Sequence, residues 1–513
     1  MKKVLIGLAV GSLLTGCFTG GSSSASNSGN KGTSTGQTTS KFTQAYKVST
    51  LVAKQCKDFK VSKLNYQPPS FVKQCWELTV PEDYSKPLNG NTITIPIAKA
   101  SSKSVTKKGS IVYFTGGPGG SALADSDNFS DTLIRDNHDL YLVDQRGTGF
   151  SQPSLFCGFA GSASESELKQ CKANFVNQGV DLNAYNTKNN ALDMIVLRKK
   201  LEELEEINDK WTLVGGSYGT RLAAAVLREE DKLTKLGMQK ESGIKAMVLD
   251  GVFPTQVSGL ADLKWANYES LKRIVEVCSR SKNCTPTQLR EGIKHHIVGL
   301  TADLHQPFLN FVLNSMSNDT DDFGEGKLTI PTLLALDTVD IASSLRSNLS
   351  TGSSNTDTPD YFAAMGLSVA CSEEYGFQPY YKAHHPERAK WGNEVQKVVD
   401  ASYHMGFSSS ACKAWSVKKA DLEESKPITN SNVPVLITNG GNDYQTPPSW
   451  GELVVKDFKN SRSITDDTLG HVVLFEGTQK GCVHNLIKDF VDDPSQLNKL
   501  DDSCLKSLKF TYK

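Results

Sequence analysis

A serine between two glycines is the first feature of this chain that could do chemistry. Residues 211–220 read Trp-Thr-Leu-Val-Gly-Gly-Ser-Tyr-Gly-Thr, which places Ser217 in a Gly-x-Ser-x-Gly pattern. A short apolar run precedes the pattern, and residues 221–230 have helix-forming composition. Strand, tight turn and helix are typical of a nucleophile elbow, in which the serine hydroxyl projects clear of a sheet. The alternative is an ordinary serine in a glycine-rich turn, because the five-residue pattern alone is weak.

A serine hydroxyl becomes a useful nucleophile only beside a base that a carboxylate orients. The chain offers Asp443 after a late apolar run and His471 in the loop beyond it, so the order is serine, acid, histidine. Among the nine histidines, only His471 follows an acid-bearing strand and sits beside a glycine. Asp250 also ends a strand-like run and is the rival acid, whereas Asp466 and Asp467 are more simply solvated loop charges.

Acyl transfer also needs backbone N–H groups aimed at the developing oxyanion. Tyr218, immediately after the serine, is expected to supply one of them. The second is expected from Gly117 in the loop Gly-Gly-Pro-Gly-Gly-Ser of residues 116–121, with Gly116 as the alternative. A phosphate-cradling loop is disfavoured, because no Gly-Lys-Ser/Thr ending and no dinucleotide fingerprint is present.

Strands that alternate with helices would position these residues. Strand-like apolar runs cover residues 110–115, 140–143, 212–214, 244–252 and 433–438, with helical spacing between several of them. This alternation predicts an α/β fold with a mostly parallel sheet flanked by helices. Residues 92–98 also alternate like a strand, and Pro96 favours an edge of the sheet for them.

The domain organisation follows from changes in composition along the chain. After residue 252 the strand pattern gives way to helix-like polar segments with Ser/Asn/Thr-rich interruptions, which indicates an inserted cap. The expected parts are a lipoprotein signal peptide and lipobox at 1–17, a flexible linker at 18–40, the first part of the core at 41–252, a mainly helical cap at 253–430 and the C-terminal part of the core at 431–513.

Composition limits the possible partners. The chain has 513 residues, 38% of them hydrophobic and 22% charged, which fits a globular protein larger than one small core. The net charge is zero, and no basic run carries interleaved aromatic residues, so nucleic acid is not an expected partner. No P-loop and no His-Glu-x-x-His is present. We expect a monomer without a metal or organic cofactor.

The N-terminal residues predict export. Lys2 and Lys3 precede an apolar run at 4–14, too short to span a bilayer but suited to a signal peptide. The run leads through Thr15 and Gly16 into Cys17, which resembles a bacterial lipobox with Cys17 as the lipidated residue. We therefore expect an exported protein anchored by lipid to a bacterial membrane and facing the periplasm or the cell surface. The alternative is an ordinary cleaved signal peptide with a chance cysteine.

Cysteine usage agrees with an oxidising compartment. Eleven cysteines without Cys17 leave ten, an even number that falls into sequence neighbours. Locality predicts five disulfides: Cys56 with Cys75, Cys157 with Cys171, Cys278 with Cys284, Cys371 with Cys412, and Cys482 with Cys504.

Several motifs in sequence order carry a family resemblance. They are the glycine loop of 116–121, Asp-Gln-Arg-Gly-Thr-Gly-Phe-Ser at 144–151, Gly-Gly-Ser-Tyr-Gly-Thr at 215–220, Val-Leu-Asp-Gly-Val at 248–252 and Asp-Tyr-Gln-Thr-Pro-Pro at 443–448. Together they resemble the proline iminopeptidase and tripeptidyl aminopeptidase group of serine peptidases. The resemblance implies an α/β-hydrolase fold with a helical cap, and release of residues or short peptides from a free peptide N-terminus.

The resemblance also suggests further roles and shows two departures. Glu373 and Glu374 lie where the family has an acidic site in the cap, which implies binding of the substrate's α-ammonium; two solvated glutamates are the alternative. Thr115 stands where iminopeptidases usually have histidine, and Val472 where glycine often follows the catalytic histidine. The segment 144–151 is expected to be structural, with Arg146 tying loops beneath the site.

The sequence therefore predicts an extracytoplasmic serine aminopeptidase with short peptides as substrates and Ser217, His471 and Asp443 as its catalytic residues. A carboxylesterase or lipase with the same three residues is the alternative enzyme. A surface binding protein that keeps the scaffold without catalysis is the alternative outside enzymology.

Overall fold

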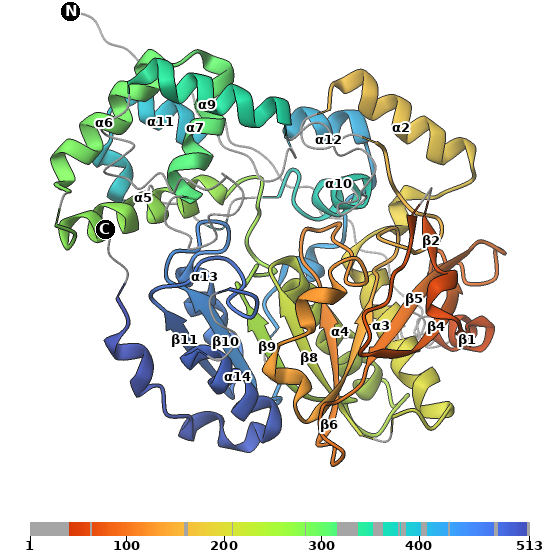
Figure 1. Ribbon diagram of the computed structural model, residues 1–513. Coiled ribbons are helices and arrows are strands. Elements are labelled where there is room, and N and C mark those ends of the chain that lie inside the picture. The colour runs from red at the N-terminus through yellow and green to blue at the C-terminus, as the bar shows by residue number, and fades with distance from the viewer. Residues whose placement is uncertain are drawn as a thin grey trace, which may run out of the picture.

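The computed structural model describes residues 41–61, 64–158, 163–207, 209–282, 284–314, 337–351, 363–377, 380, 386–401, 408–428, 431–476 and 481–509 (Figure 1). The predicted signal peptide, lipobox and linker at 1–40 lie outside these residues. Within them, no helix combines the length and the apolar character needed to cross a bilayer.

A nine-stranded sheet forms the centre of the protein, in the order β1-β4-β5-β7-β6-β8-β9-β10-β11. The pairs from β7 through β11 are all parallel, and the pairs that join β1, β4, β5 and β7 are antiparallel. The strands are β1 Thr50–Lys54, β4 Val72–Pro81, β5 Thr92–Ala100, β6 Gly109–Phe114, β7 His138–Val143, β8 Trp211–Gly216, β9 Ile244–Asp250, β10 Val435–Gly440 and β11 Ser461–Asp466. A separate hairpin pairs β2 Lys60–Val61 with β3 Leu64–Asn65.

Helices cover both faces of this sheet, which confirms the predicted α/β fold. One face packs against α3 Thr187–Glu203, α4 Tyr218–Lys235 and α13 Pro448–Val455, and the other packs against α14 Cys482–Asp492. The central strands β7 and β8 are buried along their whole length, which explains their continuous apolar runs. Because these strands are parallel, the loops after β6, β8, β9 and β10 meet at one edge.

The expectation of an edge strand at residues 92–98 is wrong. Strand β5 pairs with β4 on one side and with β7 on the other. The residues before it supply two further strands that extend the sheet. Pro96 is tolerated because the ladder with β7 begins at Ile97, one residue beyond it.

The segment between β9 and β10 is helical in its described parts, and Figure 1 shows its helices gathered on one side of the sheet. One group, α5, α6, α7, α9 and α11, shares an apolar cluster of its own, whereas α10 and α12 pack against the core. Their bounds are α5 Leu263–Ser279, α6 Pro286–Gly299, α7 Ala302–Asn314, α9 Thr338–Thr351, α10 Ala363–Glu373, α11 Asn393–Asp400 and α12 Ser409–Trp415. The remaining long helix, α2 Glu165–Asn177, lies beside α12.

The five predicted disulfides are confirmed. They join Cys56 to Cys75, Cys157 to Cys171, Cys278 to Cys284, Cys371 to Cys412 and Cys482 to Cys504. The Cys371–Cys412 bond ties α10 to α12, so the two helices that contact the core are covalently linked.

Candidate active site

Ser217 occupies a sharp turn between β8 and α4. Its backbone lies at φ 54° and ψ −124°, a left-handed conformation that non-glycine residues rarely adopt, and 9% of the residue is exposed. A Cβ added at Gly215 would meet the backbone N of Thr220 at 2.8 Å, so the strand and the helix approach too closely for a side chain. The geometry of a nucleophile elbow is therefore present.

Asp443 and His471 meet at the same edge of the sheet, after β10 and β11. The Nδ1 atom of His471 lies 2.8 Å from Oδ2 of Asp443. Asp443 is buried and also accepts hydrogen bonds from the backbone N–H groups of Gln445 and Thr446, each at 2.9 Å. The hydroxyl of Thr446 donates to Oδ2 of Asp443 at 2.7 Å and lies 3.1 Å from Nδ1 of His471. The carboxylate is thus fixed in the plane where it can orient the imidazole.

The electrostatics of the pair favour a protonated imidazole. Burial lowers the pKa of His471, but the charge of Asp443, the hydrogen bond to it and the charges of Asp250 and Glu476 together outweigh burial, so the pKa is raised above its ordinary value of 6.5. This is the environment that stabilises an imidazolium formed when the histidine takes up a proton.

Two close approaches connect the nucleophile to this pair. A Cβ added at Gly251, after β9, would lie 3.3 Å from Oδ2 of Asp443 and 3.4 Å from Nδ1 of His471. A Cβ at Gly216, the neighbour of Ser217, would lie 3.0 Å from Cγ1 of Val472. Val472 has φ 60°, which explains why glycine suits the position after the histidine and why valine is strained there.

Asp250, the rival acid, has a different set of partners. Its carboxylate accepts hydrogen bonds from the Thr438 hydroxyl at 2.8 Å and from the backbone N–H groups of Val473 and Leu474 at 3.1 and 2.8 Å. Burial raises its pKa to about 6. Asp250 therefore holds the loop that carries His471, while Asp443 makes the contact with the imidazole.

The glycine loop lies against the serine. A Cβ added at Gly116 would meet Cβ of Ser217 at 2.8 Å and its Oγ at 3.3 Å. Gly117 has φ 110°, a conformation that favours glycine. Tyr218 is the first residue of α4, so the helix itself offers its N–H no acceptor. Both expected oxyanion donors thus flank the nucleophile.

The segment 144–151 holds loops together, as expected. Asp144 accepts hydrogen bonds from the Ser121 hydroxyl at 2.8 Å and from the N–H of Phe150 at 2.8 Å, and burial raises its pKa to about 6. The fully buried Arg146 forms an ion pair with Asp193 at 2.8 Å and donates to backbone oxygens of residues 82 and 184. The structural role of Arg146 is confirmed.

Glu373 and Glu374 lie between α10 and the core. Glu373 accepts hydrogen bonds from the N–H and the hydroxyl of Thr187, both at 2.7 Å. Glu374 is buried and lies 3.3 Å from the guanidinium of Arg221 on α4. Each carboxylate has a partner from the core, and the prediction that they bind a substrate ammonium stays a prediction.

Sequence reasoning missed the residues that support the site. Thr446, Thr187 and Arg221 were not singled out for any role. For this loop a partial signal existed, because an aspartate commonly accepts the backbone N–H two residues further on in an Asx-turn, as Asp443 does from Gln445. Thr187 and Arg221 contact Glu373 and Glu374 across more than 150 positions of sequence, which no local pattern encodes.

In the part of the chain that the structure describes, no group of three or more His, Cys, Asp or Glu side chains is placed to hold a metal ion.

Comparison with known proteins agrees with this geometry. The sheet and its elbow define an α/β hydrolase, and the family model described as alpha/beta hydrolase fold matches residues 109–273, which include Ser217. The family model described as TAP-like protein matches residues 398–504, which include Asp443 and His471. The chain has the fold of an α/β hydrolase, and the two family models, which match separate parts of it, support a TAP-like protein within that group.

Curated relatives and solved structures are more distant. Serine protease Hip1 of Mycobacterium tuberculosis and of Mycobacterium bovis is 26% identical over 240 residues, which cover 41% of this chain and 42% of the relative. The match thus spans less than half the length of these relatives. Proline iminopeptidase of Mycobacterium smegmatis aligns over 81% of this chain and 95% of its own, with 10% identity and a TM-score of 0.37. An esterase from Thermogutta terrifontis aligns over 79% and 94%, with 12% identity and a TM-score of 0.34.

Proposed function

We propose that this protein is a serine peptidase that releases residues or short peptides from free peptide N-termini. The observation that carries the proposal is the 2.8 Å contact between Asp443 and His471 at the sheet edge where Ser217 sits in a strained turn. A nucleophile, a base and an orienting acid on three separate loops have a common use in acyl transfer.

In the proposed reaction, Oγ of Ser217 attacks the peptide carbonyl carbon and its proton passes to Nε2 of His471. The oxyanion accepts hydrogen bonds from the N–H groups of Gly117 and Tyr218. Collapse of the tetrahedral intermediate breaks the C–N bond, and the leaving amine takes the proton from His471. A water molecule then attacks the acyl-enzyme with His471 as base, which frees the carboxylic acid and restores the serine.

The preference for a free N-terminus rests on the family. The description of the matching family as TAP-like and the motifs shared with tripeptidyl aminopeptidases support it. The serine protease activity named for the curated relatives supports a peptide over an ester as the substrate. Export is supported by the five disulfides, and we propose Cys17 as the lipid-anchoring residue of a monomeric protein.

The test is hydrolysis of paired chromogenic peptides by a soluble form that begins at Lys41. One set has free N-termini and one to three residues, and the other set is N-acetylated; a p-nitrophenyl ester and the Ser217→Ala variant accompany both. Cleavage of the free amines alone, lost in the variant, supports the proposal. Cleavage of the ester without any peptide would instead identify an esterase, and no turnover would point to a binding protein.

A further inference from the structure

A chain of hydrogen bonds connects the cap to the residue after the nucleophile. The Tyr218 hydroxyl lies 2.8 Å from Oγ1 of Thr187, and this Oγ1 donates to Oε2 of Glu373 at 2.7 Å. The threonine hydroxyl has a single hydrogen, which the Glu373 carboxylate receives. Tyr218 must therefore be the donor to Thr187, so both hydrogen bonds point toward the carboxylate of Glu373.

Two members of this chain are buried and Glu373 is half-buried, so each link matters for the orientation of the next. Tyr218 is fully buried and Thr187 nearly so. Burial and the nearby charge of Glu373 raise the pKa of Tyr218, which keeps its hydroxyl protonated and able to donate. A buried hydroxyl without a hydrogen-bond partner is destabilising, so the tyrosine ring is held where Thr187 can accept from it.

A second branch reaches the other side of the oxyanion site. Asn190 lies one turn after Thr187 on α3, and its Nδ2 donates to Oε1 of Gln145 at 3.2 Å. Nε2 of Gln145 donates to the carbonyl oxygen of Thr115 at 2.9 Å, directly before the glycine loop. Tyr218 is bonded to Thr187, and the strand end before Gly117 is bonded through Gln145 to Asn190, so the segments of both proposed oxyanion donors are tied to the first turn of α3.

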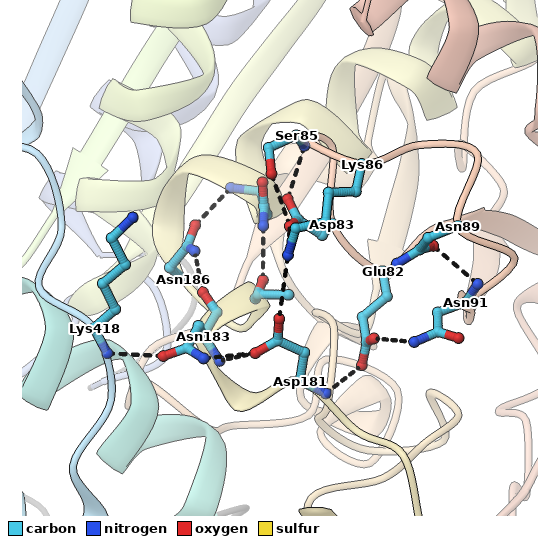
Figure 2. Close-up of polar contacts among 12 residues, drawn as sticks. Glu82, Asp83, Ser85, Lys86, Asn89, Asn91, Asp181, Asn183, Asn186 and Lys418 are labelled. Carbon is cyan, nitrogen blue, oxygen red and sulfur yellow. Dashed lines mark hydrogen bonds and ion pairs between the residues drawn. The ribbon is translucent and has the colours of Figure 1, made fainter.

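The start of α3 has its own supports, independent of Glu373. Asn186 caps the helix by accepting from the N–H of Asn189 at 2.9 Å, and its Nδ2 donates to the carbonyl oxygen of Asn183 at 2.9 Å. Figure 2 shows that Asn183 is held in turn by Asp181 and by the backbone N–H of Lys418. Loss of the Glu373 carboxylate would leave these contacts intact, but the Thr187 hydroxyl would no longer be held in its present orientation.

We infer that Glu373 is a positioning residue of the active site, which acts through Thr187 and Tyr218 on the oxyanion donors. The inference rests on the proposed acyl transfer, and it gives Glu373 a role other than binding a substrate ammonium. Glu373 is the last residue of α10 in the cap. The position of α10 against the core therefore affects the positions of the oxyanion donors beside Ser217. The neighbouring ion pair of Glu374 with Arg221 holds the same end of α10 against α4.

The experiment compares Glu373→Gln, Thr187→Val and Tyr218→Phe with the wild type on two substrates. One is a p-nitrophenyl acyl ester, which carries no ammonium group, and the other is a peptide p-nitroanilide with a free N-terminus. Thr187→Ser restores the hydroxyl, and Glu394→Gln removes a cap glutamate that is paired only at the surface with Lys397. Thermal unfolding of each variant shows whether it folds.

A positioning role predicts that kcat for the ester falls about 10- to 100-fold in Glu373→Gln and Thr187→Val with KM nearly unchanged, the size of effect that a small misplacement of catalytic groups produces. Thr187→Ser and Glu394→Gln should stay near the wild type, and Glu373→Gln combined with Tyr218→Phe should lose less than the product of the single losses. Unchanged ester turnover in Glu373→Gln, with a raised KM for the free amine alone, overturns the inference in favour of ammonium binding. If the wild type hydrolyses neither substrate and does not react with a fluorophosphonate, the proposed function itself fails.

Discussion

Asp250 accepts the backbone N–H of Leu474 at 2.8 Å, three residues beyond His471. This contact assigns two aspartates to two tasks at the same sheet edge. Asp443 contacts the imidazole of His471, whereas Asp250 binds the backbone of the loop that contains His471. Both side chains are buried, with Asp250 at the end of β9 and Asp443 three residues after the end of β10, and their hydrogen-bond partners distinguish their roles.

Substitution of each aspartate by asparagine should separate these tasks. Asp443→Asn should lower kcat on the order of 10⁴-fold with little change in thermal stability, because the imidazole loses its orienting charge. Asp250→Asn should destabilise the fold by about 1–3 kcal/mol, since the NH₂ group that replaces one carboxylate oxygen cannot accept the backbone N–H bonded to that oxygen. Ester turnover and thermal unfolding, measured on both variants, check the assignment. A larger kcat loss in Asp250→Asn than in Asp443→Asn, at equal stability, would reverse it.

The raised pKa of His471 sets the acid limit of activity. Only the neutral imidazole accepts the serine proton, so activity is lost as the pH falls through the pKa of His471. Because Asp443 raises that pKa above 6.5, kcat/KM for an uncharged ester should reach half its maximum at a pH above 6.5. The residual activity of Asp443→Asn should have its midpoint at a lower pH. A wild-type midpoint at or below 6.5 would contradict this account.

The sequence predicted the sheet, the elbow and the disulfides because local signals encode them. Continuous apolar runs follow from burial of the parallel strands on both faces, and Ser217 stands between glycines because strand and helix approach closely there. The prediction that residues 92–98 form an edge strand also relied on a local signal, and it was wrong. Pro96 is a local signal for an edge, but β4 pairs with β5 and β1 pairs with β4, so the edge of the sheet lies at β1.

The supports of the site could not be predicted, since they join distant parts of the chain. Glu373 meets Thr187 across 186 positions of sequence, and the predicted alternatives for it, a solvated charge or a substrate contact, are both local interpretations. Asp250 and Asp443 looked equivalent because each follows an apolar run. Which of the two aspartates lies next to His471 depends on the order of the strands in the sheet and on the path of the loop after β11.

The Thr446 hydroxyl should contribute to catalysis through Asp443. Thr446→Val keeps the shape of the side chain and removes a donor to a buried carboxylate, a hydrogen bond worth about 1.5–3 kcal/mol. We expect kcat to fall roughly 10- to 100-fold with KM little changed, whereas Thr446→Ser should retain most of the activity. Steady-state kinetics on one ester substrate check both variants. Equal activity of the valine and serine variants would show that the hydroxyl does not orient the carboxylate.

The Cys371–Cys412 disulfide should stabilise the protein more than Cys278–Cys284 does. The two bonds close loops with sequence separations of 41 and 6, and chain entropy assigns them about 4 and about 2 kcal/mol. Replacement of each pair by serine, followed by urea unfolding, measures the difference.

The consequence for activity should also differ between the two pairs. Cys371 lies on α10 two residues before Glu373, so loss of this bond loosens the helix end that holds Thr187. Ester kcat should therefore fall in the Cys371/Cys412 double variant at temperatures where it is still folded. The Cys278/Cys284 double variant should keep its kcat, because that bond joins the end of α5 to the loop before α6, within the apolar cluster of the cap. Equal kcat in both double variants would mean that the position of α10 does not affect the reactivity of Ser217.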